Sequence, residues 1–188
     1  FSGRRGIHAW VCDEAARGMQ NDMRTAVVSY CNVGVGNEMS GKTQLQHPLP
    51  PRLKAIYKKL EPEFPRLIIK EHNLLSQEKH RKRFLEYLPD VKTRNTVEAK
   101  WGSYKTPITP QLGLEMWKTW CEEYEQFMKV DQKRPGQYTN NQARLAKEAL
   151  IFTYLYPRID ANVSTTINHL LKSPWCIHPK TGKSLLRI

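Results

Sequence analysis

The sequence contains no C-x-x-C pair and no long apolar run. Scattered cysteines argue against a zinc ribbon or a disulfide framework, and we expect them to be buried free thiols. No stretch approaches the roughly 20 apolar residues of a membrane span, and none has the shape of a signal peptide. We therefore expect a soluble, intracellular protein. The four cysteines are Cys12, Cys31, Cys121 and Cys176.

Acidic residues are few relative to basic ones. The 188 residues include 18 Asp and Glu against 30 Lys and Arg, which gives a formal net charge of +12. This balance favours a polyanionic partner such as nucleic acid, a nucleoside triphosphate or a membrane surface. A hydrophobic content of 39% is enough for one domain with a buried core, with or without a subdomain.

Apolar and polar residues alternate near the start of the chain. In residues 7–11 this period of two predicts a strand with His8 and Trp10 on one face. Asp13 is a suitable N-cap, and apolar residues then recur at helical spacing up to about Cys31. A strand followed by a helix is therefore expected.

The same alternation returns near the other end. Residues 158–163 are predicted to form a short strand, with Arg158 and Asp160 projecting from one side of it. Ser164 is a suitable N-cap for a following helix. A hairpin is expected at the chain end, with the turn "PKTG" placing Gly182 last.

The middle of the chain has the period of helices. A connection rich in Gly and Pro comes first, and apolar residues then recur at helical spacing in four segments. A mostly helical subdomain is therefore expected over residues ~52 to ~155. The four segments are residues 53–60, 77–88, 114–128 and 141–155.

Residues 36–43, "GNEMSGKT", match the phosphate-loop pattern G-x-x-x-x-G-K-[ST]. That motif requires a buried strand before the loop and a helix after it, whose N-terminus receives the phosphates. Here a helix is predicted before the loop, and nearby prolines leave room for little more than one helical turn after it. An ATP-binding loop using Lys42 is kept only as an alternative.

Two other features have both a functional and a structural interpretation. The basic run of residues 79–83 would contact a phosphate backbone or, alternatively, form the solvated face of a helix. Trp101, Trp117 and Trp120 would stack on bases, but they fall within or near helical apolar stripes. Core packing is therefore the favoured interpretation for the tryptophans.

The first residues, "FSGRRGIHAW", combine groups that suit phosphate binding. Two glycines let the backbone approach a ligand closely, and two arginines supply planar guanidinium groups that match phosphate oxygens. A serine hydroxyl and a histidine lie beside them. A tight basic turn on the surface is the alternative. The residues are Ser2, Gly3, Arg4, Arg5, Gly6 and His8.

Residues of the last third offer similar chemistry. Arg158, Lys172 and His178 are phosphate-binding types, and Asp160 adds one carboxylate. Two-metal nucleotidyl transfer usually needs two or three carboxylates. A single Asp cannot hold both metals, so the other acids would have to come from outside this chain.

At these two places the sequence resembles the small, catalytic subunit of the eukaryotic and archaeal DNA primases. "SGRRGIHAWVCDE" is similar to that family's second motif, Ser-x-x-x-x-x-His with an Arg-Arg pair inside it. "PRIDANVS" is similar to its third motif, a hydrophobic residue followed by Asp, and "NHLLKSPWCIHPKTGK" resembles the stretch that follows in the eukaryotic branch. Residues ~33 to ~150 match only by position and helical character.

The resemblance implies an α/β (α+β) fold. Residues 1–36 and 152–188 would belong to a catalytic domain built on a palm-like mixed sheet with helices. Residues 37–151 would form a connection and an inserted, mostly α-helical subdomain. The family's first motif, Asp-x-Asp, is absent from this chain, so we expect a C-terminal fragment that is inactive alone.

The resemblance also implies an activity, namely synthesis of short RNA primers de novo on single-stranded DNA during replication, by two-metal nucleotidyl transfer. Asp160 would be a catalytic, metal-binding carboxylate for Mg²⁺ or Mn²⁺. Structural Zn²⁺ is expected only in upstream sequence. The nucleotide-binding residues would be Ser2, Gly3, Arg4, Arg5, Gly6, His8, Arg158, His169, Lys172 and His178.

Partners and location follow from the same resemblance. We expect the primase large subunit, the DNA polymerase alpha complex, a single-stranded DNA template and ribonucleoside triphosphates as partners, in the nucleus and without a membrane. Two alternatives stay open: a non-catalytic module that binds nucleic acid or nucleotide, and the phosphate-loop NTPase.

Overall fold

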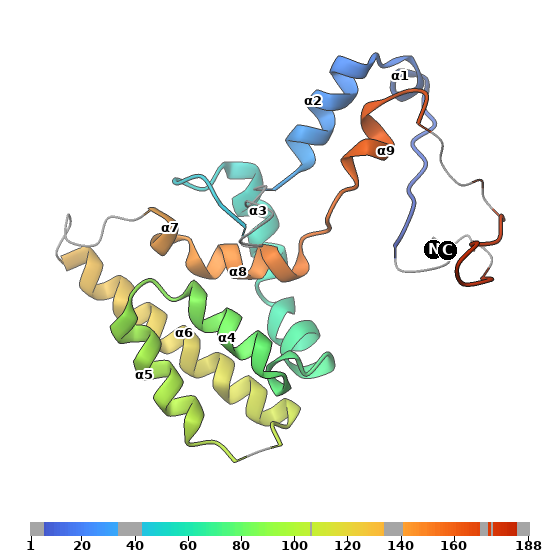
Figure 1. Ribbon diagram of the computed structural model, residues 1–188. Coiled ribbons are helices and arrows are strands. Elements are labelled where there is room, and N and C mark those ends of the chain that lie inside the picture. Colours follow the sequence, from blue (N-terminus) through green and yellow to red (C-terminus); the bar gives the residue numbers. More distant parts are fainter. Residues whose placement is uncertain are drawn as a thin grey trace. The chain divides into compact units, whose positions relative to one another are not determined.

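The computed structural model describes residues 6–33, 43–105, 107–133, 141–169, 173 and 175–183, and these are mostly helical (Figure 1). The chain divides into two compact units. The end unit comprises Phe1–Asn32 and Arg158–Ile188, and the middle unit comprises Val33–Pro157. The sequence predicted a catalytic domain of residues 1–36 and 152–188 and a connection with a helical subdomain of residues 37–151. These are functional assignments, and they stay a prediction.

The middle unit is a group of packed helices. Its elements are α3 (Pro51–Leu60), the π-helix η1 (Pro65–Glu71), the 3₁₀ helix η2 (Leu74–Ser76), α4 (Glu78–Tyr87), α5 (Val91–Gly102), α6 (Pro110–Lys133), α7 (Asn141–Arg144) and α8 (Ala146–Leu155). Helix α6 packs on η1 and α5, whereas α8 packs on α3 and α4. The four predicted helical segments are confirmed by α3, α4, α6 and the pair α7 and α8.

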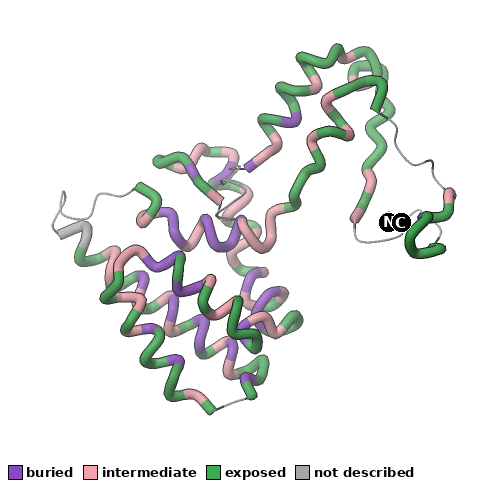
Figure 2. The backbone as a smooth tube through the Cα atoms, in the orientation of Figure 1, coloured by how far each residue is buried: buried purple, intermediate pink, exposed green. Residues whose placement is uncertain are grey.

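Aromatic side chains form the centre of the middle unit. Trp120, Phe64 and Phe84 are fully buried, and Figure 2 shows buried positions along the helices of this group. The rings of Trp117 and Trp120 are stacked with centroids 5.3 Å apart. The indole N–H of Trp120 donates to the carbonyl oxygen of Phe84 at 3.0 Å, which satisfies its one polar group. Trp101 is buried as well, so the predicted core role of the three tryptophans is confirmed.

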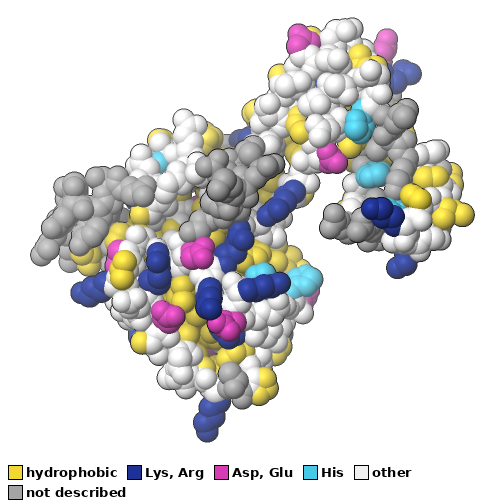
Figure 3. All heavy atoms as spheres, viewed as in Figure 1, with side chains coloured by type: hydrophobic (Ala, Val, Ile, Leu, Met, Phe, Trp, Pro, Cys, Tyr) yellow, Lys and Arg dark blue, Asp and Glu magenta, His cyan; other side chains and the backbone are white. Residues whose placement is uncertain are grey.

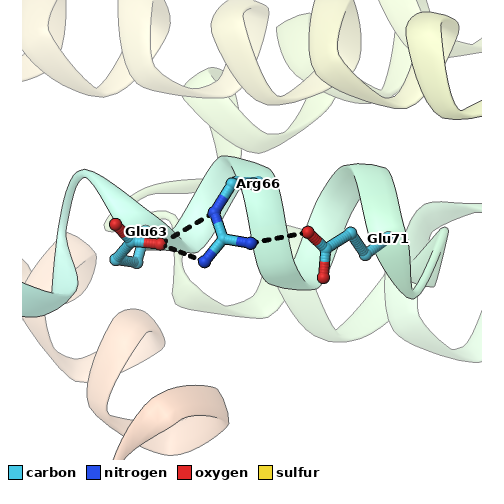
Figure 4. A network of polar contacts seen from close by, with 3 residues as sticks. All are labelled: Glu63, Arg66 and Glu71. Carbon is cyan, nitrogen blue, oxygen red and sulfur yellow. Dashed lines mark hydrogen bonds and ion pairs between the residues drawn. The ribbon is translucent and has the colours of Figure 1, made fainter.

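The π-helix η1 has wider turns than an α-helix. The backbone N–H of His72 donates to the carbonyl oxygen of Leu67, five residues earlier, at 3.0 Å. Arg66 donates to Glu63 at 2.6 and 2.9 Å and to Glu71 at 2.6 Å (Figure 4). All three side chains are about half exposed, so these ion pairs contribute little to stability.

Helix α6 approaches η1 very closely at Gly113. A Cβ atom added to Gly113 would lie 3.2 Å from Cγ2 of Ile69, a residue with no exposed surface. This contact is tighter than a side chain at Gly113 would tolerate without movement of its neighbour. A larger residue at Gly113 would therefore require the side chain of Ile69 to move.

The described residues of the end unit form three short helices. They are α1 (Glu14–Gly18), α2 (Asn21–Cys31) and α9 (Ala161–Thr165). Asp13 Oδ1 accepts a hydrogen bond from the backbone N–H of Ala16 at 2.9 Å, which confirms the predicted N-cap. The predicted single helix is interrupted at Met19 and Gln20, whose backbone is extended, and Arg24 donates there to the carbonyl oxygens of Ala16 and Met19 at 3.0 and 2.9 Å. These bonds satisfy backbone oxygens at the end of α1.

The predicted mixed α/β sheet is wrong, since the described residues contain no sheet. Residues 7–11 are not a strand, and in the predicted strand of residues 158–163 Asp160 is instead the N-cap of α9. A strand satisfies its backbone groups only beside a neighbouring strand, and neither segment has one in the described part of the chain. Asp is also a favoured N-cap residue. Ser164, predicted as the cap, lies inside α9.

The predicted turn near the C-terminus is confirmed. The backbone N–H of Gly182 donates to the carbonyl oxygen of His178 at 2.9 Å, and the N–H of His178 donates to Lys183 at 2.8 Å. Gly182 has a φ of +64°, a conformation that glycine adopts without strain. The second predicted hairpin strand, residues 183–188, lies almost entirely outside the described residues.

The four cysteines are free thiols, as predicted, but they are not buried. Cys12 is exposed, and Cys31, Cys121 and Cys176 are half-buried. In the part of the chain that the structure describes, no helix combines the length and the apolar character that crossing a membrane requires.

Candidate functional site

The fold brings segments from both ends of the chain into one unit. Helices α2 and α9 pack together, and Asn21 Oδ1 accepts a hydrogen bond from the backbone N–H of Ile167 at 3.1 Å. Gly6 and His8 precede α2, and Asp160 precedes α9, so all three belong to this unit. The described residues of the two predicted halves of the site therefore belong to one structural unit.

His8 is half-buried, and its Nδ1 atom is buried without a hydrogen-bond partner among the described residues. An unsatisfied buried polar atom costs about 1–3 kcal/mol. A ligand oxygen or N–H group that reaches Nδ1 would remove this cost. The predicted strand around His8 is absent, so its orientation depends on the surrounding loop.

Asp160 is exposed at the start of α9. Its side chain makes no capping hydrogen bond, and the described residues offer it no ion-pair partner. A free carboxylate of this kind suits a hard cation such as Mg²⁺. No group of three or more His, Cys, Asp and Glu residues that could hold a metal ion occurs in the described ranges. Asp160 would thus supply one ligand, with others coming from elsewhere.

His178 is buried at the C-terminal turn, with 8% of its surface exposed. Its Nδ1 accepts a hydrogen bond from the backbone N–H of Lys180 at 3.2 Å. A neutral ring that accepts at Nδ1 carries its proton on Nε2 and can donate from there. His169, by contrast, is exposed. These two histidines therefore differ in how firmly the fold holds them.

The predicted site residues are only partly visible. Six of them, Gly6, His8, Arg158, Asp160, His169 and His178, are described and belong to the end unit. No hydrogen bond or ion pair joins His8, Arg158 and Asp160 to one another within the described residues. The others, Ser2, Gly3, Arg4, Arg5 and Lys172, lie outside the described residues.

The phosphate-loop match lies mostly outside the described residues as well. Of residues 36–43 only Thr43 is described, and no helix follows it until α3 begins at Pro51. A phosphate loop delivers its phosphates to a helix that starts at the loop's end. The described context therefore argues against that motif.

A pocket in the middle unit was not predicted from the sequence. It measures about 330 Å³, and its lining includes Thr43, Tyr87, Arg94, Gln142, Ala146 and Ala149. Its residues come from the loop at Thr43 and from the helices α4, α5, α7 and α8 or the segments next to them. No single stretch of sequence carries a pattern that would reveal it.

Buried ionisable groups gather where α8 meets α3. Lys147 Nζ lies 2.7 Å from Glu61 Oε1. Burial raises the pKa of the neighbouring Glu148, whose Oε2 has no hydrogen-bond partner among the described residues. Burial, followed by the charge of Glu148, raises the pKa of Tyr57. This cluster is half-buried inside helix packing, which indicates a structural role.

The described residues define a basic, mainly helical protein whose two ends form one unit with a free carboxylate and a buried histidine. Comparison with known proteins then gives the family. The family model described as DNA primase small subunit matches residues 1–187, so the chain belongs to that family. The resemblance stated from the sequence is confirmed.

Individual relatives agree. The chain is 34% identical over 190 residues to the DNA primase small subunit of Drosophila melanogaster, covering 97% of this chain and 41% of the relative. It is 31% identical over 186 residues to that of Schizosaccharomyces pombe, covering 97% and 39% respectively. The chain therefore spans about two fifths of the length of these curated relatives.

Proposed function

We propose that the chain forms part of the catalytic subunit of a DNA primase, which makes short RNA primers de novo on single-stranded DNA during replication. One observation supports this most. Asn21 and Ile167 join the two chain ends in one unit, and the segments beside them carry the two motifs at which the sequence resembles catalytic primases. The phosphate-binding residues of the first motif, Ser2 to His8, and Asp160 would act on one nucleotide.

Asp160 would be a metal ligand in this site. Bound Mg²⁺ or Mn²⁺ would offset charge on the phosphates and help activate the attacking hydroxyl. The residue's exposed, uncapped carboxylate supports this role. Because the described residues contain no cluster of metal ligands, the remaining carboxylates would come from outside them.

Basic residues would bind the triphosphate of the incoming nucleotide, which carries about four negative charges. Arg4 and Arg5 would donate charge-assisted hydrogen bonds to its oxygens, with Arg158 and Lys172 adding positive charge. Such binding also aligns the reacting groups, which supplies much of the rate in phosphoryl transfer.

The histidines and small residues would complete the nucleotide site. His178 would contact a phosphate or sugar oxygen, and the unsatisfied Nδ1 of His8 would gain a partner from the ligand. His169 would line the pocket from an exposed position. Ser2, Gly3 and Gly6 would let the chain approach the phosphates closely.

The partners follow from the same proposal. They are the primase large subunit, the DNA polymerase alpha complex, a single-stranded DNA template and ribonucleoside triphosphates, and the protein would work in the nucleus. The name of the relatives, DNA primase small subunit, supports an assembly with a second subunit.

Primer synthesis tests the proposal directly. The protein as its gene encodes it, incubated with single-stranded DNA, ribonucleoside triphosphates and Mg²⁺ or Mn²⁺, should produce short labelled RNA chains without a starting primer. Lys42→Ala should retain this synthesis, whereas a phosphate-loop NTPase would lose nucleotide binding. Absence of primers with either metal, in the presence of the large subunit, would contradict the proposal.

A further inference from the structure

The pocket of about 330 Å³ in the middle unit is separate from the residues assigned to the nucleotide site. It opens where the end of α4 meets α5, α7 and α8. Three alanines, Ala143, Ala146 and Ala149, line it, and because their side chains are short, space remains beside them. Leu88 and Pro89 add apolar surface. The helices therefore leave a preformed hollow at this point.

Arg94 supplies the positive charge of this pocket. Its Nε atom donates to the carbonyl oxygen of Leu85 at 3.2 Å, which holds the guanidinium in place. No carboxylate lies within ion-pair distance of Arg94 in the described part of the chain, although Glu86 also lines the pocket. A fixed guanidinium without a carboxylate partner presents paired N–H donors that match two oxygens of a phosphate group.

Hydroxyl groups stiffen one side of the pocket. The Tyr87 hydroxyl lies 2.7 Å from Thr153 Oγ1, and Thr153 Oγ1 lies 2.9 Å from Thr43 Oγ1. The three residues come from α4, α8 and the loop before α3, so their hydrogen bonds fix these segments to one another. The pocket is thus held open by polar contacts and does not depend on one loop.

The surface of α4 beside the pocket is cationic. Lys79 and Arg83 are four residues apart and therefore share one face of α4. Lys79 has no acidic partner among the described residues, whereas Lys82 is paired with Glu78 at 2.6 Å. Burial lowers the pKa of His80, and Lys79 and Arg83 lower it further, as expected in a positive local field. Figure 3 shows Lys and Arg side chains distributed over the visible face of the middle unit.

We propose that the cationic face of α4 and the Arg94 pocket bind the phosphate backbone of a single-stranded nucleic acid. Lys79 precedes the pocket residue Glu86 by seven positions, which is about 10 Å along a helix. Lys79 is therefore about two helical turns from the edge of the pocket, and a strand that follows α4 would place different phosphates beside Lys79 and in the pocket. The inference deepens the proposed function, which already takes a single-stranded template, by adding a site for the strand that requires neither Asp160 nor catalysis.

Salt-dependent binding of a labelled thymidine oligonucleotide to the full chain tests the proposal. For single strands, log K falls with log salt by about 0.7 for each phosphate neutralised. Arg94→Gln should weaken binding and reduce this slope by about 0.7, and adding Lys79→Gln should reduce it by about 0.7 more. The control Lys118→Gln removes an exposed lysine of α6, 3.8 Å from Glu122, and should leave the slope unchanged.

Arg94→Lys tests whether the loss of binding in Arg94→Gln comes from the lost charge or from a disturbed fold. It keeps the cation, so it should restore most of the slope lost in Arg94→Gln. If Arg94→Gln binds as the parent does, or if Arg94→Lys binds as poorly as Arg94→Gln and both unfold at lower temperature, the proposal is wrong.

Competitors identify the ligand. Unlabelled oligonucleotide should displace the labelled strand at lower phosphate concentration than ATP or inorganic phosphate does. If Arg94→Gln lowers ATP affinity but leaves the oligonucleotide bound as before, the pocket takes a free nucleotide and the strand proposal fails. If polyglutamate of equal charge displaces the strand equally well, an acidic protein segment is the partner instead. If the parent protein makes no primers but the Arg94→Gln variant still loses strand binding, only the proposed function is contradicted.

Discussion

Asn21 accepts a hydrogen bond through Oδ1 from the backbone N–H of Ile167 at 3.1 Å. Asn21 is the first residue of α2, and Ile167 follows α9 closely. This bond joins two segments that are far apart in the sequence and that carry different candidate motifs. The integrity of the proposed nucleotide site should therefore depend on it.

Asn21→Ala should loosen this link. Loss of one such hydrogen bond costs about 1 kcal/mol, which corresponds to a roughly five-fold faster exchange of the Ile167 amide hydrogen. Amide hydrogen exchange measured by NMR or mass spectrometry checks the effect. Asn162→Ala, at an exposed position of α9, is the matched control and should leave that amide unchanged. If the Ile167 amide hydrogen exchanges equally fast in the Asn21 variant and the parent, this hydrogen bond does not stabilise the contact between the two segments.

Gly113→Ala should destabilise the middle unit. The new methyl group would meet Cγ2 of the buried Ile69 at 3.2 Å, and overpacking of this kind costs about 1–3 kcal/mol. The better helix propensity of alanine offsets up to about 1 kcal/mol of that cost. Gly102→Ala is the control, because a methyl group there meets no atom within 4 Å. In thermal denaturation the Gly113 variant should unfold below both the parent and the control, and a higher melting temperature would disprove the close packing.

Glu148→Gln should stabilise the protein at neutral pH. Burial raises the pKa of Glu148 above the ordinary value of 4.5, so the folded state holds the proton more tightly than the unfolded state. The associated stability is complete below pH 4.5 and is lost as the pH rises toward the folded pKa. The variant has no such loss, so its melting temperature should match the parent near pH 4 and exceed it at pH 7.

A comparison across pH separates Glu148 from its neighbours. Burial tends to raise the pKa of Glu61, but hydrogen bonds from Lys147 and Tyr57 lower it, so its stabilisation is present above pH 4.5 and fades in acid. This opposite trend is common to the parent and the variant. Glu115→Gln, at an exposed position of α6, should show no difference at either pH. If Glu148→Gln raises the melting temperature equally at pH 4 and pH 7, the raised pKa of Glu148 is contradicted.

Helices with strong apolar periodicity were predictable, and weakly patterned ones were not. The long helix α6 follows from the spacing of residues such as Trp117 and Tyr124, which are buried. The helix α5 buries only Val97 and Trp101 among polar residues, so its sequence carries little period. The π-helix η1 begins at Pro65, and its wide turns follow no α-helical spacing.

The strands were predicted from too short a pattern. Ile159, Ala161 and Val163 alternate, but three apolar residues cannot separate a strand from a helix start, and Asp160 acts as the N-cap. The site residues were chosen by chemical type and family resemblance, and the structure places six of them in one unit. Arg94 escaped prediction, because its pocket exists only after α4, α5 and α8 have packed.

Arg5→Ala should mainly weaken binding of the incoming nucleotide. It removes charge-assisted hydrogen bonds that exist in the ground state as well as in the transition state, so KM should rise with little change in kcat. Loss of such a bond is worth about 1.5–3 kcal/mol, or a rise in KM of roughly 10- to 100-fold. Steady-state kinetics of primer synthesis measures it, with Arg17→Ala on α1 as the control. An unchanged KM would instead favour the alternative that Arg5 belongs to a basic turn on the surface.

Asp160→Ala tests most directly whether the two chain ends build one catalytic site. In the protein as its gene encodes it, dinucleotide formation from labelled ribonucleotides on single-stranded DNA should disappear, while circular dichroism and melting temperature stay as in the parent, because the side chain makes no capping bond. Asp13→Ala, which removes the N-cap of α1 and costs about 1 kcal/mol, should still synthesise dinucleotides. Retained synthesis in the Asp160 variant would contradict a catalytic role for this site.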